Sequence, residues 1–280
     1  MTDSTPAIVP TTALEAVARA EIDTQVATAK RYPRDVDQAV ARALQMATAT
    51  PEVAASCFYV LKRKDNRTGK VVTIEGLSIR MAELFACAWG NLAYGFRAIA
   101  DDGKAVVLEG VCIDYEANLR CTKQVRRNVL DRNGRRLSED LVTVTTMAAG
   151  AIASRNAILG VVPGVYTAQA LAAVKQAAVG DAGGFRSRRD KAVSYFAKLG
   201  VDAAHVCAAV GKDAVEAITE EDVATLLGLA TAIKDGEMTP EQAFPVAHAP
   251  AADPEGMSRS EALARELAGG QTPGAKEPTA

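Results

Sequence analysis

The 280-residue sequence is poor in the residues that build metal centres and disulfide frameworks. It contains two histidines, His205 and His248, and neither has a second metal ligand at helical spacing. Its five cysteines are an odd number and form no CxxC pair, which argues against a zinc cage or a disulfide-stabilised secreted domain. We therefore expect reduced thiols and neither a metal nor a cofactor.

Long apolar runs are also missing. No segment approaches the roughly 20 apolar residues that cross a bilayer. No basic segment followed by an apolar one resembles a secretory signal. The sequence thus predicts a cytoplasmic protein that does not contact a membrane.

The motifs of several common enzyme classes are absent as well. The sequence has no GxxxxGK[ST], no GxSxG and no HExxH, which excludes P-loop ATPases and the hydrolases defined by the other two motifs. The nearest approach to a catalytic carboxylate cluster is Asp114 and Glu116, with Lys123 further along the chain. Because residues i and i+2 of a strand share a face, a metal-dependent nuclease is one hypothesis, and a solvated strand face is the other.

What the sequence does contain is charge of opposite sign in different regions. The overall composition, 49% hydrophobic and 24% charged, suits a buried core and excludes fibrous or wholly disordered classes. Segment 62–70 has five basic residues and one acidic residue, segment 120–136 has seven and one, and segment 211–280 has five and thirteen. These net charges of +4, +6 and −8 favour a polyanionic partner for the central region. Solvated hairpin tips and a solvated tail would explain the same runs.

Hydrophobic spacing and turn signals predict an α+β fold. The expected elements are, in order, helices at 13–30 and 34–49, a β-hairpin of 57–64 with 71–76, a helix at 77–90, strands at 92–101, 105–117 and 119–130, and helices at 142–160 and 165–178. The short links between the three consecutive strands suit an antiparallel meander, and Asp102-Gly103 and Asn133-Gly134 are tight-turn signals. The sequence therefore predicts an antiparallel hairpin and meander covered by helices, followed by a small helical module.

The same signals divide the chain into five regions. We expect a disordered segment at 1–12, an α+β core at 13–178, a linker at 179–185, a helical module at 186–244 and a flexible tail at 245–280. Inside the module, Thr219 with Asp222 has the spacing of a helix N-terminal capping box.

Segment 119–130 carries the strongest signal for nucleic-acid binding. Strand alternation places Arg120, Thr122, Gln124, Arg126 and Asn128 on one face, and Lys123, Val125 and Arg127 on the other. Guanidinium and amide groups on an open strand face can follow a phosphate backbone without reading bases. The candidate DNA-binding residues are Arg120, Lys123, Arg126, Arg127, Arg132, Arg135 and Arg136, and less directly Arg155, Lys62, Arg63 and Lys64. For Arg155, a salt bridge to a nearby acidic residue is an equal alternative. Because only 5% of the residues are aromatic, we expect phosphate contacts to outweigh base stacking.

Three parts of the sequence together resemble the core of phage single-strand annealing proteins. They are IEGLSIRMAELFACAWGN, the meander that follows it, and TTMAAGAIASRNAILGVVP. Over about residues 55–163, the chain is similar to the Erf group and more remotely to RecT, Redβ and the eukaryotic Rad-type annealing proteins. The resemblance implies a hairpin, a helix, a meander and a second helix, with single-stranded DNA in a basic groove around an oligomeric ring or helical filament. Segment 186–244 resembles helical C-terminal modules of phage recombination proteins, which often recruit partners. Family members often carry more lysine and aromatic residues in the groove than this chain does.

The resulting hypothesis is a non-enzymatic, homo-oligomeric protein that anneals complementary DNA strands without ATP in phage recombination, in the host cytoplasm. Its C-terminal module would bind a phage exonuclease or the host single-strand binding protein. The alternatives are the metal-dependent nuclease at Asp114 and Glu116 and a non-catalytic adaptor or structural protein whose basic hairpins face water.

Overall fold

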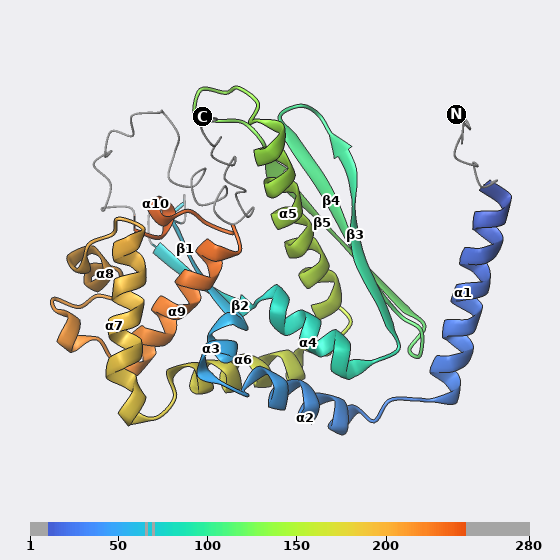
Figure 1. The fold of residues 1–280 in the computed structure, drawn as a ribbon, viewed down its shortest axis with the longest axis horizontal. Coiled ribbons are helices and arrows are strands. Elements are labelled where there is room, and N and C mark those ends of the chain that lie inside the picture. The colour runs from blue at the N-terminus through green and yellow to red at the C-terminus, as the bar shows by residue number, and fades with distance from the viewer. Residues whose placement is uncertain (1–10, 65–66, 69–70, 245–280) are drawn as a thin grey trace, which may run out of the picture.

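The computed structural model describes residues 11–64, 67–68 and 71–244, and it has the mixed α+β architecture that the sequence predicts (Figure 1). The predicted flexible tail, 245–280, lies outside the described residues, and so do residues 1–10 of the predicted disordered segment 1–12. Thr11 and Thr12, by contrast, belong to the first helix, so the prediction is wrong for these two residues.

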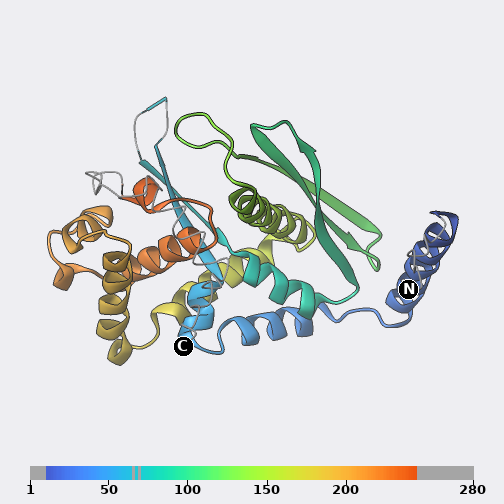
Figure 2. The ribbon, with the colours of Figure 1, turned by 45° about the horizontal axis from the view of Figure 1, so that its top comes forward.

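Three helices precede the first strand: α1 (Thr11–Arg31), α2 (Val36–Ala47) and α3 (Pro51–Ser56). Helix α2 begins after Asp35, whose side chain accepts the Gln38 N–H, and it turns an alanine-rich stripe into the core. Helix α1 extends away from the rest of the molecule (Figures 1 and 2). Among its described side chains only Ala29 is buried.

Strands β1 (Phe58–Lys64) and β2 (Val71–Leu77) form an antiparallel hairpin in which Phe58 lies opposite Leu77. Helix α4 (Ile79–Trp89) follows directly, because the Ser78 side chain caps its first turn and Gly90, with φ of +65°, ends it. This helix contacts both the hairpin and the helix that covers the second sheet, so it joins the two β-structures of the molecule.

The second sheet is the predicted meander of β3 (Leu92–Asp101), β4 (Ala105–Asp114) and β5 (Leu119–Asn128), in the order β3-β4-β5 and antiparallel throughout. Helix α5 (Glu139–Leu159) lies along one face of this sheet (Figure 2). Its approach requires a glycine on the central strand, since a Cβ at Gly110 would collide with the carbonyl oxygen of Ala153. The opposite face is not covered by α5, and we call it the open face.

The chain ends, within the described residues, in a group of helices that covers the hairpin. These are α6 (Gly164–Val179), α7 (Ala182–Lys198), α8 (Ala203–Ala209), the short 3-10 helix η1 (Val215–Ala217), α9 (Glu220–Lys234) and α10 (Pro240–Ala243). The predicted capping box of Thr219 and Asp222 is confirmed at the start of α9. Among the described helices, none combines the length and apolarity needed to cross a membrane.

The predicted boundary at 179–185 needs a correction. Helix α7 already begins at Ala182, and α9 packs against β1, where Gly228 leaves room for the side chains of Val60 and Phe58. One continuous hydrophobic cluster therefore runs from α2 through the hairpin to Phe244. The physical reason is that the apolar residues of β1 need a cover, and the helices after 182 supply it.

Candidate nucleic-acid interface

The register of the meander confirms the two faces predicted for β5. Arg126 lies opposite Val107 and Gln124 opposite Glu109, on the open face. The intervening side chains face α5: Val125 packs into the cluster beneath that helix, and Cys121 lies beside Gly160. Arg120 and Arg126 therefore share the open face, whereas Lys123 and Arg127 lie on the α5 side.

Two cations of β5 are exposed and form no ion pair with any residue that the structure describes: Arg120 and Lys123. Since β5 is an edge strand of the three-stranded sheet, a ligand can approach both of them along the same edge. Arg126 is also exposed, but its guanidinium lies 2.9 Å from Asp102. We call Arg120, Lys123 and Arg126 the β5 cation row.

The open face also holds a cation that the sequence analysis missed. Arg97 on β3 lies opposite Glu109 and pairs with it at 2.6 Å. The hydrogen bond from Arg97 is the main cause that lowers the pKa of Glu109, and Gln124 and Arg120 act in the same direction. The signal that would have found Arg97 is strand alternation along 92–101, applied to β3 as it was to β5.

The basic loop after β5 is an ordered turn. Asp131 accepts the backbone N–H groups of Asn133 and Arg135, and Gly134 has φ of +76°. Arg132 and Arg135 are exposed, and Arg135 lies 3.5 Å from Asp131. The remaining predicted residue of this loop, Arg136, pairs with Asp101 at 2.7 Å and more loosely with Glu139 at 3.7 Å. The loop thus extends the β5 cation row at its C-terminal end.

The basic residues of the hairpin behave differently from one another. Lys62 is half-buried, and its Nζ donates to the backbone carbonyl of Ala209 on α8. Burial lowers the pKa of the Lys62 ammonium. Arg63, the next residue, is exposed and by strand alternation lies on the other side of the strand, and its charge adds to the lowering of the Arg127 guanidinium pKa. For Lys64 the structure describes the backbone alone, paired with Val71.

Two of the predicted DNA-binding residues, Arg127 and Arg155, are bonded to other parts of the same chain. Arg155 is 5% exposed, forms a buried ion pair with Glu237 and lies over the Tyr59 ring at 4.4 Å. The salt bridge that the sequence analysis gave as the alternative for Arg155 is therefore confirmed. Arg127 is half-buried and donates to the carbonyl of Gly236, and burial lowers the pKa of its guanidinium. Both act here as contacts between α5 or β5 and the turn after α9.

The carboxylates of the nuclease hypothesis are also occupied. The two terminal nitrogens of Arg34 lie 2.6 and 2.5 Å from the Asp114 oxygens, and its Nε lies 3.1 Å from Glu116. A guanidinium thus fills the position that a metal ion would need. Within the described residues, no group of three or more histidine, cysteine, aspartate or glutamate side chains could hold a metal. Arg34, just before α2, carried no motif that marked it in the sequence.

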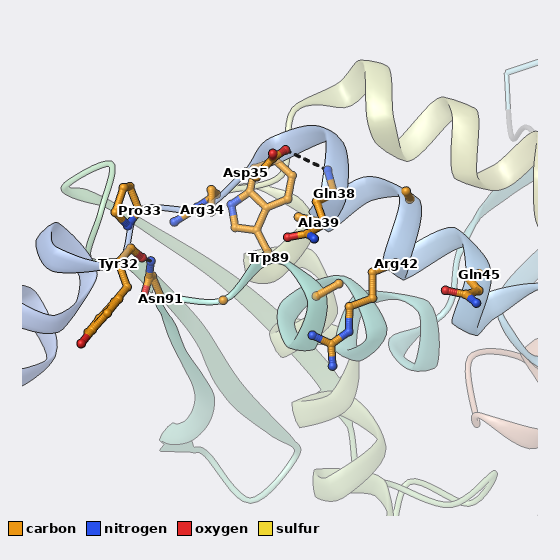
Figure 3. A pocket seen from close by; sticks show the side chains of 13 residues that line it. Tyr32, Pro33, Arg34, Asp35, Gln38, Ala39, Arg42, Gln45, Trp89 and Asn91 are labelled. Atoms are coloured by element: carbon orange, nitrogen blue, oxygen red, sulfur yellow. Dashed lines mark hydrogen bonds between the residues drawn. The ribbon is translucent and has the colours of Figure 1, made fainter.

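A cavity of about 610 Å³ lies beside this ion-pair cluster, between the segment before α2 and the end of α4 (Figure 3). Its lining includes Gln38, Arg42 and Trp89. The Trp89 ring is stacked by Arg34 at 5.0 Å, and its indole Nε1 has no hydrogen-bond partner within the described residues. Among the predicted DNA-binding residues whose side chains the structure describes, none lines this cavity.

Comparisons of the chain with protein-family models, with curated proteins and with solved structures find no match. The arrangement of side chains therefore carries the functional argument that follows.

Proposed function

We propose that this protein binds single-stranded DNA along the β5 cation row and the loop after it, and that it anneals complementary strands without ATP. The observation that supports this most is an edge strand with exposed cations on both of its faces, Arg120 and Lys123, continued by Arg132. A flexible strand that follows this edge meets an exposed cation at every third residue of β5, at Arg120, Lys123 and Arg126.

The physical basis of annealing here is charge neutralisation. Two complementary strands repel each other through their phosphates, and guanidinium and ammonium groups lower that repulsion while leaving the bases free to pair. The exposed aromatic residues of the meander, Tyr94 and Phe96, lie on β3, at the other edge of the sheet. We therefore assign stacking a minor share of the affinity.

Self-association and partner recruitment belong to the same proposal. A single row of a few cations binds weakly, and a ring or helical filament of identical subunits would multiply the contacts along one strand. The helices after α7 carry exposed acidic residues, among them Glu216 and Glu220, that suit a basic patch on a phage exonuclease or on the host single-strand binding protein.

The test is a pair of double variants of equal charge change. Arg120→Ala with Lys123→Ala removes two cations of the β5 row, and Arg186→Ala with Lys198→Ala removes two exposed cations of α7. We expect the first variant to weaken binding of a labelled oligo-thymidine about tenfold at low salt and to flatten the slope of log K against log salt by about 1.4. The second should keep wild-type binding. Equal behaviour of the two variants in fluorescence anisotropy would remove the site assignment.

Two further assays separate the proposal from its alternatives. Complementary oligonucleotides should pair faster with the wild-type protein than without it. A labelled strand incubated with Mg²⁺ or Mn²⁺ should remain intact, because Asp114 and Glu116 are already bound by Arg34. Cleavage would favour the nuclease, and a protein that neither retains nor anneals DNA would favour the adaptor.

A further inference from the structure

The turn that ends α9 places an oxygen acceptor on each of three cations from the other half of the molecule. Asp235 pairs with Arg80 of α4 at 2.6 Å, the Gly236 carbonyl accepts from Arg127 of β5, and Glu237 pairs with Arg155 of α5. We call residues 235–237 the acidic turn. Two of its three partners, Arg127 and Arg155, are residues that the sequence marks as phosphate-binding candidates.

The acidic turn is held in place by the end of its own helix. Gly236 has φ of +68°, and the backbone N–H of Glu237 donates to the carbonyl of Ala232, a typical helix C-terminal arrangement. Met238, the next residue, is buried and anchors the chain. In the free protein the turn therefore presents two carboxylates and one carbonyl side by side.

Carboxylate and phosphate oxygens are interchangeable partners for a guanidinium, since both offer anionic acceptors in a geometry that matches its planar fork. The acidic turn thus occupies the same donors that a DNA backbone would use. Arg63 on β1, which lies close enough to Arg127 to lower the pKa of its guanidinium, adds a further exposed cation at the same junction.

The contacts of the turn are not fully satisfied. One oxygen of Asp235 is buried and has no hydrogen-bond partner within the described residues. Burial is also the main cause that raises the pKa of the Glu237 carboxyl, against the opposing effect of Arg155. Gly236, between them, is exposed to solvent. An incompletely satisfied, partly exposed turn is easier to displace than a fully bonded one.

We propose that the acidic turn is an intramolecular competitor of the DNA backbone, which covers Arg127 and Arg155 in the free protein and is displaced when a single strand binds. This rests on the proposed function and adds a means by which that function is restrained. Phosphates of a strand lying along the β5 cation row would replace the turn on these two arginines, and the covered cations would join the exposed row.

The first experiment weakens the turn without removing its shape. Glu237→Gln keeps a hydrogen-bond acceptor for Arg155 but loses the negative charge, and Glu216→Gln, on an exposed part of η1, makes the same change of net charge elsewhere. For oligo-thymidine we expect Glu237→Gln to bind about fivefold more tightly than wild type at low salt, with a slope steeper by about 0.7 for each added phosphate contact. Glu216→Gln should match wild type. Equal affinity and slope for Glu237→Gln and wild type would overturn the proposal.

The second experiment follows the turn in the wild-type protein and needs no substitution. Amide hydrogen exchange is compared with and without saturating oligo-thymidine, at the amides of Glu237 and Met238, which donate to Ala232 in the free protein. We expect exchange there to become faster on binding, because the turn leaves its partners. Unchanged or slower exchange with DNA bound would mean that the turn stays in place, and would overturn the proposal. A wild-type protein with no salt-dependent binding at all would instead remove the proposed function, so the two failures are distinguishable.

Discussion

The molecule carries two basic strand segments, and the structure uses them differently. In the hairpin, Lys62 is bonded to α8, and its neighbours Phe58 and Val60 are buried against the C-terminal helices. In the meander, Arg120 and Lys123 lie on β5, an edge strand of the sheet, and both side chains are exposed. Runs of similar charge in the sequence thus become an internal bond in one strand and an exposed surface in the other.

The difference between the two strands teaches that a cation is available for a ligand only where the fold leaves its donors unbonded. Each guanidinium or ammonium that is bonded to its own chain must lose that bond before it can bind a phosphate, and this loss offsets the new contact. Under the proposed function, we therefore expect the exposed members of the row to meet DNA first, and Arg127 and Arg155 to bind it only after the acidic turn is displaced.

The largest effect that would test this division is on stability. Arg155→Met removes one partner of a buried ion pair and leaves Glu237 without its cation, so we expect a loss of about 3 kcal/mol in the free energy of unfolding. Arg120→Met, an exposed residue without an ion pair among the described residues, should change it by less than about 0.5 kcal/mol.

Urea denaturation followed by circular dichroism measures both variants under the same conditions. The two substitutions remove the same side-chain type, so each serves as the control for the other. If both variants lost similar stability, the separation of bonded and exposed cations would be wrong.

Strand periodicity explains why part of this arrangement was predictable. Backbone geometry fixes the period of two, so adjacent residues such as Arg126 and Arg127 had to lie on opposite faces of β5. The capping box of Thr219 and Asp222 was also predictable, because it depends only on two residues that are three positions apart. Helix α3 was missed although Thr50 and Pro51 have the N-cap and N1 pattern.

Contacts between distant segments could not be predicted in this way. Glu237 is 82 residues from Arg155, and Ala209 is 147 residues from Lys62. Nothing in local spacing says that the end of α9 will reach α5, because that depends on how the helices after α5 return to cover the hairpin. The sequence therefore predicted which residues are basic on each face, and the packing decides which of them are exposed.

Acid titration gives an intermediate effect that is specific to the meander. Backbone N–H groups of Ala105 and Lys104 and the side chain of Arg126 lower the pKa of Asp102 from 3.8 to about 2. A carboxyl whose pKa is lower in the folded state stabilises the fold above its unfolded pKa, and this contribution disappears as the pH falls from about 4 to about 2.

Asp102→Asn should therefore lose less stability than wild type over that range, measured as the urea midpoint against pH. Asp23→Asn, on the exposed helix α1, is the control for the loss of one carboxylate. An Asp102→Asn profile that runs parallel to wild type would show that the turn at the end of β3 does not contribute to acid stability.

The smallest effect compares adjacent residues of one strand. Lys62→Gln removes an ammonium that is already bonded to Ala209, and we expect oligo-thymidine binding to change by less than about twofold, with the same salt slope. Arg63→Gln removes an exposed guanidinium on the other side of β1, and the slope should become shallower by about 0.7, the value for one lost phosphate contact on a single strand. Fluorescence anisotropy over a range of salt concentrations measures both.

Because the two substitutions remove one positive charge each at neighbouring positions, long-range electrostatics alone predicts equal slopes. Equal slopes would mean that DNA responds to the overall charge of the hairpin, and unequal slopes in the expected order would mean that the bond between Lys62 and α8 withholds that cation from the strand.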